Sequence, residues 1–172
     1  STLDRSSAAS DVYKRQNLWA SVGVHPDYED TPDPTPEELV RLSEHPKVVA
    51  IGETGLDYYR LSEPLDWQRE RFRRHIRAAR DTGLPLIVHT RASAEDTVRV
   101  LQEETASEAG GVMHCFTENW EVAQAALDQN FYISLSGIVT FKNAQVVHEV
   151  AAKVPLDRLL IETDSPYLAP VP

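Results

Sequence analysis

Four apolar segments of this chain each end in a side chain that can bind a metal ion. These side chains are, in chain order, Glu53, His89, His114 and Asp164. Short apolar runs are typical of buried parallel strands, and the carboxyl ends of such strands meet at one edge of a sheet or barrel. Four potential ligands at the same relative position therefore indicate a shared site.

Candidate strands and helices alternate from Asn17 onward. The expected strands cover residues 18–24, 48–52, 86–89, 111–114, 132–136 and 159–162. The expected helices begin near Thr35, Asp66, Ser93, Thr117 and Asn143. A strand followed by a helix, with short loops, predicts parallel βαβ units. The fold class is therefore α/β, and six strands form either an open sheet or part of an eight-stranded barrel.

Several helices have readable ends and faces. Thr35 to Glu38 reads as a capping box with proline in the first helical position, and Gly83 is expected to end the helix that begins near Asp66. The side chains expected to point inward are Phe72, Ile76 and Ala79, then Val122, Ala125 and Ala126, then Val146 and Val150. The histidines on helices or helix ends, His45, His75 and His148, are expected at the surface.

The composition limits the class of function. The chain has 172 residues with 17 Lys and Arg against 27 Asp and Glu, a net charge of −10. This argues against a passive polyanion binder, but not against a nucleic-acid enzyme whose metal ions supply positive charge. Cys115 is the only cysteine, which fits a reducing compartment. With no membrane-length apolar run in the sequence, a cytoplasmic protein without membrane contact is expected.

Residues 1–16 differ from the rest because they lack an apolar period. We interpret them as a disordered leader or a translated cloning or assembly scar, with a natural flexible N-terminus as the alternative. The domain is then expected to cover residues 17–172.

The proposed site combines imidazole and carboxylate groups, which suit Zn, Mn or Fe. Glu53 could bridge two ions, or it could be a helix-capping or salt-bridge acid. Asp164 is the candidate for orienting or deprotonating water, and Glu162 either supports it or forms an interior ion pair. Two further residues are candidates for substrate binding: His25 and Arg91 could each contact a phosphate, or simply be loop residues.

Several motifs together resemble the TatD-type metal-dependent deoxyribonucleases. They are GVHP at 23–26, GETGLDYY at 52–59, VHTR at 88–91, HCFT at 114–117, FYISLSGIVTF at 131–141 and the segment 159–170. The resemblance implies a TIM-like barrel with about two divalent ions, Mg, Mn or Zn, at its mouth. It places Glu53, His89, His114 and Asp164 at metal-ligand positions, with Glu53 and Asp164 also catalytic. It further implies a 3′-to-5′ exonuclease or DNase acting on single-stranded DNA or 3′ ends, with no obligate protein partner.

The chain also departs from this family. Family members open with a His-x-His strand that supplies further ligands, and no His-x-His occurs here. We therefore expect an incomplete barrel with about six of eight strands, and the activity of this chain stays open. The alternatives are an ester or amide hydrolase with the same metal centre, such as an aminoacyl-tRNA deacylase, and an inactive remnant.

Overall fold

The computed structural model describes residues 18–59 and 65–172. The predicted leader at residues 1–16 lies outside the described residues, so its nature stays a prediction. Within the described part, strands and helices alternate as the sequence predicts.

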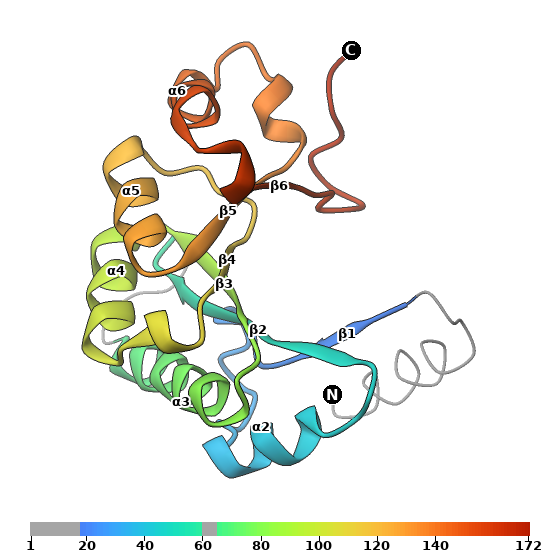
Figure 1. Ribbon diagram of the computed structural model, residues 1–172, viewed down its shortest axis with the longest axis vertical. Coiled ribbons are helices and arrows are strands. Elements are labelled where there is room, and N and C mark those ends of the chain that lie inside the picture. The colour runs from blue at the N-terminus through green and yellow to red at the C-terminus, as the bar shows by residue number, and fades with distance from the viewer. Residues whose placement is uncertain (1–17, 60–64) are drawn as a thin grey trace.

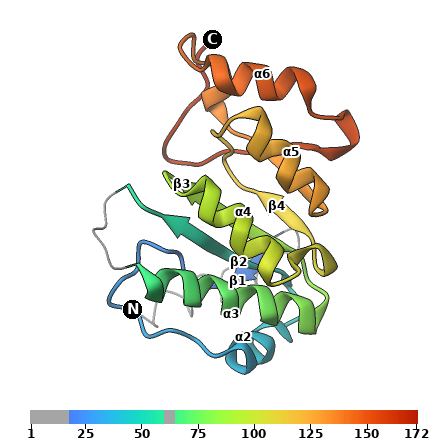
Figure 2. The ribbon, with the colours of Figure 1, turned by 90° about the vertical axis from the view of Figure 1, so that its left-hand side faces the viewer.

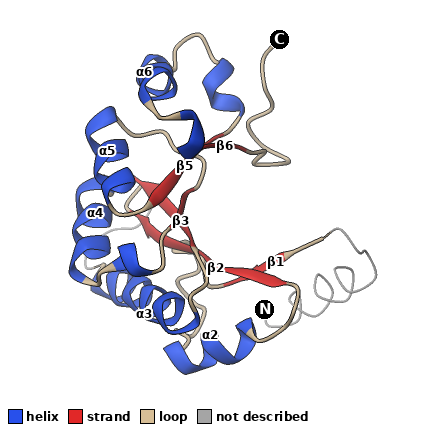
Figure 3. Ribbon diagram, in the orientation of Figure 1, coloured by secondary structure: helices blue, strands red, loops and turns tan. Residues whose placement is uncertain are grey.

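Six parallel strands form one sheet in the order in which they occur along the chain (Figure 3). They are β1 (Ala20–Val22), β2 (Val48–Asp57), β3 (Leu86–Arg91), β4 (Gly111–Met113), β5 (Phe131–Leu135) and β6 (Leu159–Ile161). Each connection moves the chain one place along the sheet, and the helices follow one another along one side of the curving sheet (Figures 1 and 2). This is the arrangement of a barrel wall and not of a doubly wound sheet. Within the described residues the sheet does not close, so the α/β prediction of an incomplete TIM-like barrel is confirmed.

The helices cover the outer side of this wall. They are α2 (Pro36–Ser43), α3 (Asp66–Thr82), α4 (Ala94–Glu103), α5 (Trp120–Asp128) and α6 (Gln145–Lys153), with short 3-10 turns η1 (Ala106–Glu108), η2 (Gly137–Thr140) and η3 (Leu156–Arg158). Thr35 and Glu38 form the predicted capping box at the start of α2. Gly83 ends α3 in the left-handed conformation, as its position predicts.

Two helices differ in detail from the sequence prediction. Helix α5 is capped by Asn119, whose side chain accepts from the backbone N–H of Val122, and not by Thr117. Helix α6 buries Val147 together with Val150, while Val146 is exposed. Adjacent valines carry the same apolar signal, so packing against the sheet, and not the pattern, decides which of them turns inward.

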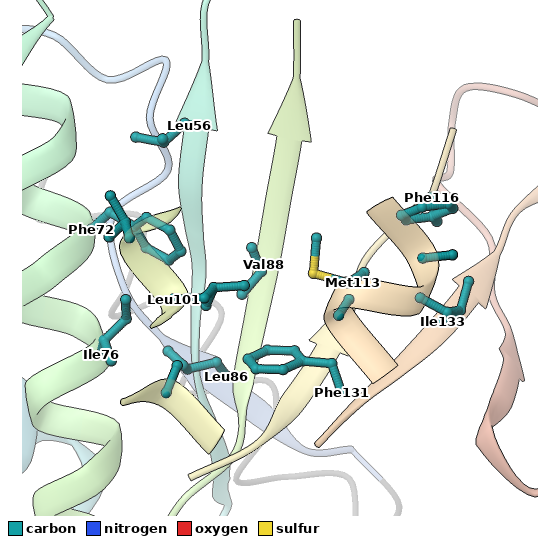
Figure 4. Packing of buried hydrophobic residues seen from close by; sticks show 14 of the residues in the cluster. Leu56, Phe72, Ile76, Leu86, Val88, Leu101, Met113, Phe116, Phe131 and Ile133 are labelled. Atoms are coloured by element: carbon teal, nitrogen blue, oxygen red, sulfur yellow. The ribbon is translucent and has the colours of Figure 1, made fainter. Parts of the chain in front are cut away.

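The core lies between the strands and the helices (Figure 4). Its fully buried members include Leu86, Val88, Met113, Phe131 and Ile133 from the strands and Phe72, Ile76 and Leu101 from the helices. Residues that alternate with them along a strand point to the opposite, inner side of the wall. His89 follows Val88 and therefore lies on that inner side. The apolar core faces the helices, so polar groups can occupy the inner face of the sheet at the strand ends.

Candidate metal centre

Glu53 stands in an irregular part of β2. Ile51 pairs with Leu86 and Thr54 pairs with Val88, so Gly52 and Glu53 together stand opposite the single residue Ile87. Such a bulge bends a strand and re-aims its side chains. The strand therefore continues to Asp57 instead of ending at residue 52 as predicted, and Glu53 lies within it.

The glycines beside Glu53 are required by the close approach of β3. Gly52 and Gly55 have φ angles of 149° and 128°, which side-chain-bearing residues rarely adopt. A Cβ atom on Gly52 would lie 2.6 Å from the carbonyl oxygen of Ile87, and one on Gly55 would overlap that of His89. The sequence around Glu53 thus permits a bulge at this position.

Three imidazole rings surround one oxygen of Glu53. Its Oε1 atom lies 3.4 Å from Nδ1 of His89, 3.5 Å from Nε2 of His25 and 3.6 Å from Nε2 of His114. The same Nε2 atom of His114 lies 3.6 Å from Oδ1 of Asp164. The four residues that follow the apolar segments therefore converge at the carboxyl end of the sheet, and His25 joins them.

These distances fit donors that share a cation better than donors that bond one another. Hydrogen bonds between nitrogen and oxygen are typically about 2.9 Å long. Two ligands each about 2.1 Å from a tetrahedral ion lie about 3.4 Å apart. Among the described residues, His25, Glu53 and His89 offer ligand atoms that all lie within 4.8 Å of one another. The donor set is thus suited in type and spacing to a divalent metal ion.

The remaining ring nitrogens of two histidines are held by carboxylates. Nε2 of His89 lies 2.8 Å from Oδ2 of Asp57, and Nδ1 of His114 lies 2.8 Å from Oε1 of Glu162. Each carboxylate accepts a hydrogen bond from one ring nitrogen, and the other ring nitrogen faces Glu53. This carboxylate–histidine arrangement is common around metal ligands.

Glu162 is fixed by three contacts. Besides His114, it accepts hydrogen bonds from the backbone N–H of Cys115 at 2.6 Å and from the hydroxyl of Ser134 at 2.7 Å. Of the two alternatives for Glu162, support of Asp164 or an interior ion pair, the structure shows a pair with His114. Asp164 itself is more exposed, with 39% of its side-chain surface accessible.

The cluster favours positive charge. Burial by itself raises the pKa of Glu53, but His25, His89 and His114 outweigh it and hold that pKa well below its ordinary value. Glu162 raises the pKa of the His114 imidazole above its ordinary value despite partial burial. For His89, burial lowers the pKa, but Glu53 and Asp57 outweigh it and the pKa is raised. Glu53 is therefore ionised, and its negative charge can attract a cation.

An open pocket of about 670 Å³ adjoins the cluster. Its lining residues are Gly23, His25, Asp27, Tyr28, Glu53 and Tyr167. Arg91 is exposed at the end of β3, and its guanidinium lies 3.8 Å from the centre of the Tyr59 ring. Of the two substrate-binding candidates, His25 is thus in the cluster, and Arg91 is stacked on a neighbouring tyrosine.

The sequence interpretation missed two polar residues near this site. Asp57 is buried although it lies beyond the expected strand end, and the only signal for it was the continuation of the GETGLD run. His75, expected at the surface, is fully buried. The charged residues around it on α3 conceal its burial, because the helix has ion pairs on one side and packs its other side inward.

Cys115, expected as a small buried residue, is half-buried, and its thiol lies 3.2 Å from the Ser136 hydroxyl.

Comparison with known proteins gives a consistent result. Residues 2–172 match the family model described as TatD related DNase. The chain is 53% identical over 161 residues to a protein of Escherichia coli K12 named "Uncharacterized metal-dependent hydrolase YcfH". This match covers 94% of this chain and 60% of the relative. It is 35% identical over 156 residues to the "3'-5' ssDNA/RNA exonuclease TatD" of Escherichia fergusonii, with 90% and 60% covered.

A solved structure agrees with the fold. The crystal structure of YJJV, a TatD homologue from Escherichia coli K12, superimposes with a TM-score of 0.84 at 30% identity, covering 92% of this chain and 62% of that one. The chain thus spans about 60% of the length of the curated relatives it matches. In the part of the chain that the structure describes, no helix has the length and apolar character needed to cross a membrane.

Proposed function

The chain belongs to the TatD-related DNase family, and we propose that it acts as a divalent-metal-dependent hydrolase of phosphodiester bonds in DNA. One observation carries this proposal: Oε1 of Glu53 lies 3.4 to 3.6 Å from nitrogens of His25, His89 and His114. The exonuclease name of the relative at 35% identity supports DNA as substrate and cleavage from the 3′ end.

Glu53, His89, His114 and Asp164 would hold the divalent ions. When bound, such ions offset charge on the phosphate oxygens and lower the pKa of water. Asp57 and Glu162 each accept a hydrogen bond from a histidine ring nitrogen, and the opposite ring nitrogen would be the one that binds the ion. Asp164 is partly exposed beside His114, where its carboxylate can take up a proton from the attacking water.

The pocket next to the cluster suits a nucleotide. Tyr28 and Tyr167 both line it, and 61% and 72% of their surfaces are exposed. Exposed aromatic rings stack on nucleobases of any sequence. His25 and the stacked Arg91 are the candidates for contacts with phosphate, so the base and the phosphate would each have partners. Because the chain carries a net charge of −10, the ions themselves would provide most of the attraction for the DNA backbone.

The direct test uses metal-stripped protein with single-stranded DNA labelled at either end. Addition of Mn²⁺, Mg²⁺ or Zn²⁺ is expected to restore stepwise loss of nucleotides from the 3′ end, and Glu53→Gln is expected to abolish it. Glu121→Gln, an exposed change on α5, is the matched control. Hydrolysis of aminoacyl esters without loss of nucleotides would contradict the proposal and favour the ester-hydrolase alternative. Metal binding without either activity would support a metal site in this chain but contradict the proposed hydrolysis.

A further inference from the structure

Helix α3 carries three buried polar side chains on one face. Gln68, Arg71 and His75 follow one another at helical spacings of three and four residues, and each is at most 2% exposed. We call these three residues the α3 polar stripe. It runs beside the apolar side chains of Phe72 and Ile76, which pack into the core. Buried polar groups need partners, and all three find theirs in the segments that carry the metal centre.

His75 is bound to the strand end that precedes His25. The backbone N–H of Val24 donates to Nε2 of His75 at 3.0 Å, and Nδ1 of His75 lies 2.8 Å from the carbonyl oxygen of Arg71. A backbone N–H can only donate, so Nε2 must be the acceptor and Nδ1 carries the proton. His75 is thus a neutral ring whose tautomer is fixed by both neighbours.

Arg71 holds the loop that follows. Its Nη1 atom donates to the carbonyl oxygens of His25 at 3.2 Å and Tyr28 at 2.9 Å, and its Nη2 atom donates to that of Thr31 at 3.0 Å. Nε completes the set with Asp33 at 2.6 Å. One guanidinium therefore fixes a loop from 25 to 33 that has no strand or helix of its own.

Gln68 joins this loop to the end of β2. Its Oε1 atom accepts from the backbone N–H of Asp57 at 2.7 Å, and its Nε2 atom donates to the carbonyl oxygens of Asp57 at 3.1 Å and Pro26 at 3.5 Å. Asp57 is the residue whose carboxylate bonds His89. Gln68 is therefore connected to His89 through Asp57 and to His25 through the neighbouring Pro26. These are the two histidines that lie closest to Glu53.

From these contacts we propose that the α3 polar stripe positions His25 and His89 against Glu53. Val24, His25 and Pro26 are held by their backbone atoms, and His89 is held through Asp57. The consequence is a pair of imidazole rings 4.6 Å apart, both facing one carboxylate oxygen. The inference rests on the proposed metal-dependent function for its purpose. Where the stripe bonds His25 and Tyr28, it bonds only their backbone atoms, and its side chains are not among the residues that line the pocket.

The test compares metal affinity with folding in the full chain. Gln68→Ala and Arg71→Lys are expected to weaken Zn²⁺ or Mn²⁺ binding by about ten- to a hundredfold, as is typical for residues that orient metal ligands. The matched controls are Gln124→Ala, exposed on α5, and Arg74→Lys on α3, whose Nε contacts Glu70 of the same helix. Both controls should keep the parent affinity. Measurements are made well below the unfolding temperature of each variant, and circular dichroism checks that it is folded.

A second readout does not depend on metal. In metal-free protein with labelled histidine, the ring signals of His25 and His89 are expected to shift in Gln68→Ala, while that of His148 does not. Folded variants with parent metal affinity and unchanged ring signals would overturn the proposal. So would unfolding of both variants, because the stripe would then serve stability alone. Failure of the parent to bind metal, with the ring signals shifting as expected, would instead overturn the proposed function and leave the positioning intact.

Discussion

Oδ2 of Asp57 lies 2.8 Å from Nε2 of His89, and the opposite nitrogen of the same ring lies 3.4 Å from Glu53. The buried carboxylate therefore decides which ring nitrogen carries the proton and which one faces the cluster. It also accepts a hydrogen bond from the backbone N–H of Tyr59. This second contact fixes the orientation of the carboxylate. The position of the His89 ring on β3 therefore depends on the backbone conformation at the end of β2.

Asp57→Asn tests this relationship. The amide keeps the size of the side chain but removes the charge and can present the wrong group to His89, so metal affinity should fall by about ten- to a hundredfold. Isothermal titration with Zn²⁺ or Mn²⁺ measures the change. Asp128→Asn, an exposed carboxylate at the end of α5, is the control. Equal affinities in Asp57→Asn and the parent would show that the ring does not need this partner.

Removal of metal should lower thermal stability. An ion that binds only the folded chain stabilises it by about 2.7 kcal/mol when its concentration is a hundred times the dissociation constant. Thermal unfolding with excess Mn²⁺ or Zn²⁺ should therefore occur at a higher temperature than with a chelator. Glu53→Gln should unfold at one temperature in both solutions. A shift of equal size in Glu53→Gln would place the stabilising ion elsewhere in the chain.

His75 makes the stability depend on pH. Burial lowers its pKa from 6.5 to about 4, and the nearby Arg71 charge acts in the same direction, while the Arg71 carbonyl and Asp33 oppose it. The His75 ring binds a proton more readily in the unfolded chain than in the folded one. The neutral ring therefore contributes fully to the free energy of unfolding above about pH 6.5, and this contribution is lost as the pH falls towards 4. The loss is roughly 3 kcal/mol for such a pKa difference. Chemical unfolding at several pH values should give a flatter profile for His75→Gln than for the parent, and parallel profiles would contradict the assignment.

Tyr167 tests the nucleotide pocket. If its exposed ring stacks on a base, Tyr167→Ala should raise KM for single-stranded DNA by about tenfold, because base stacking contributes about 1 to 3 kcal/mol. The turnover number should change little, and Tyr167→Phe should behave as the parent because the ring is kept. An equal loss in the phenylalanine and alanine variants would assign the role to the hydroxyl group instead.

The apolar runs and the polar residues that follow them were readable from the sequence because they are local features, although β2 continues past Glu53 to Asp57. Glu53, His89, His114 and Asp164 could be placed at one edge on that basis, and the structure brings them together. Their role as ligands stays a proposal.

The partners of these residues were not readable. Asp57 reaches His89 because a bulge at residues 52 and 53 changes the register of β2. His75 reaches Val24 across 51 residues of sequence. Both depend on how distant segments pack, and no local pattern carries that information. The two alternatives for His25 stayed open for the same reason, because only its approach to Glu53 distinguishes a loop histidine from a member of the cluster.

The location of bound metal is the most direct test of the proposed metal centre. Crystals grown with Zn²⁺ or Mn²⁺ and measured on both sides of the absorption edge of that metal would show where the ion lies. The proposed metal centre predicts an anomalous peak within coordination distance of Glu53 and of at least one nitrogen of His25, His89 or His114. A peak only at other residues, or no peak at metal concentrations that saturate binding in solution, would contradict it.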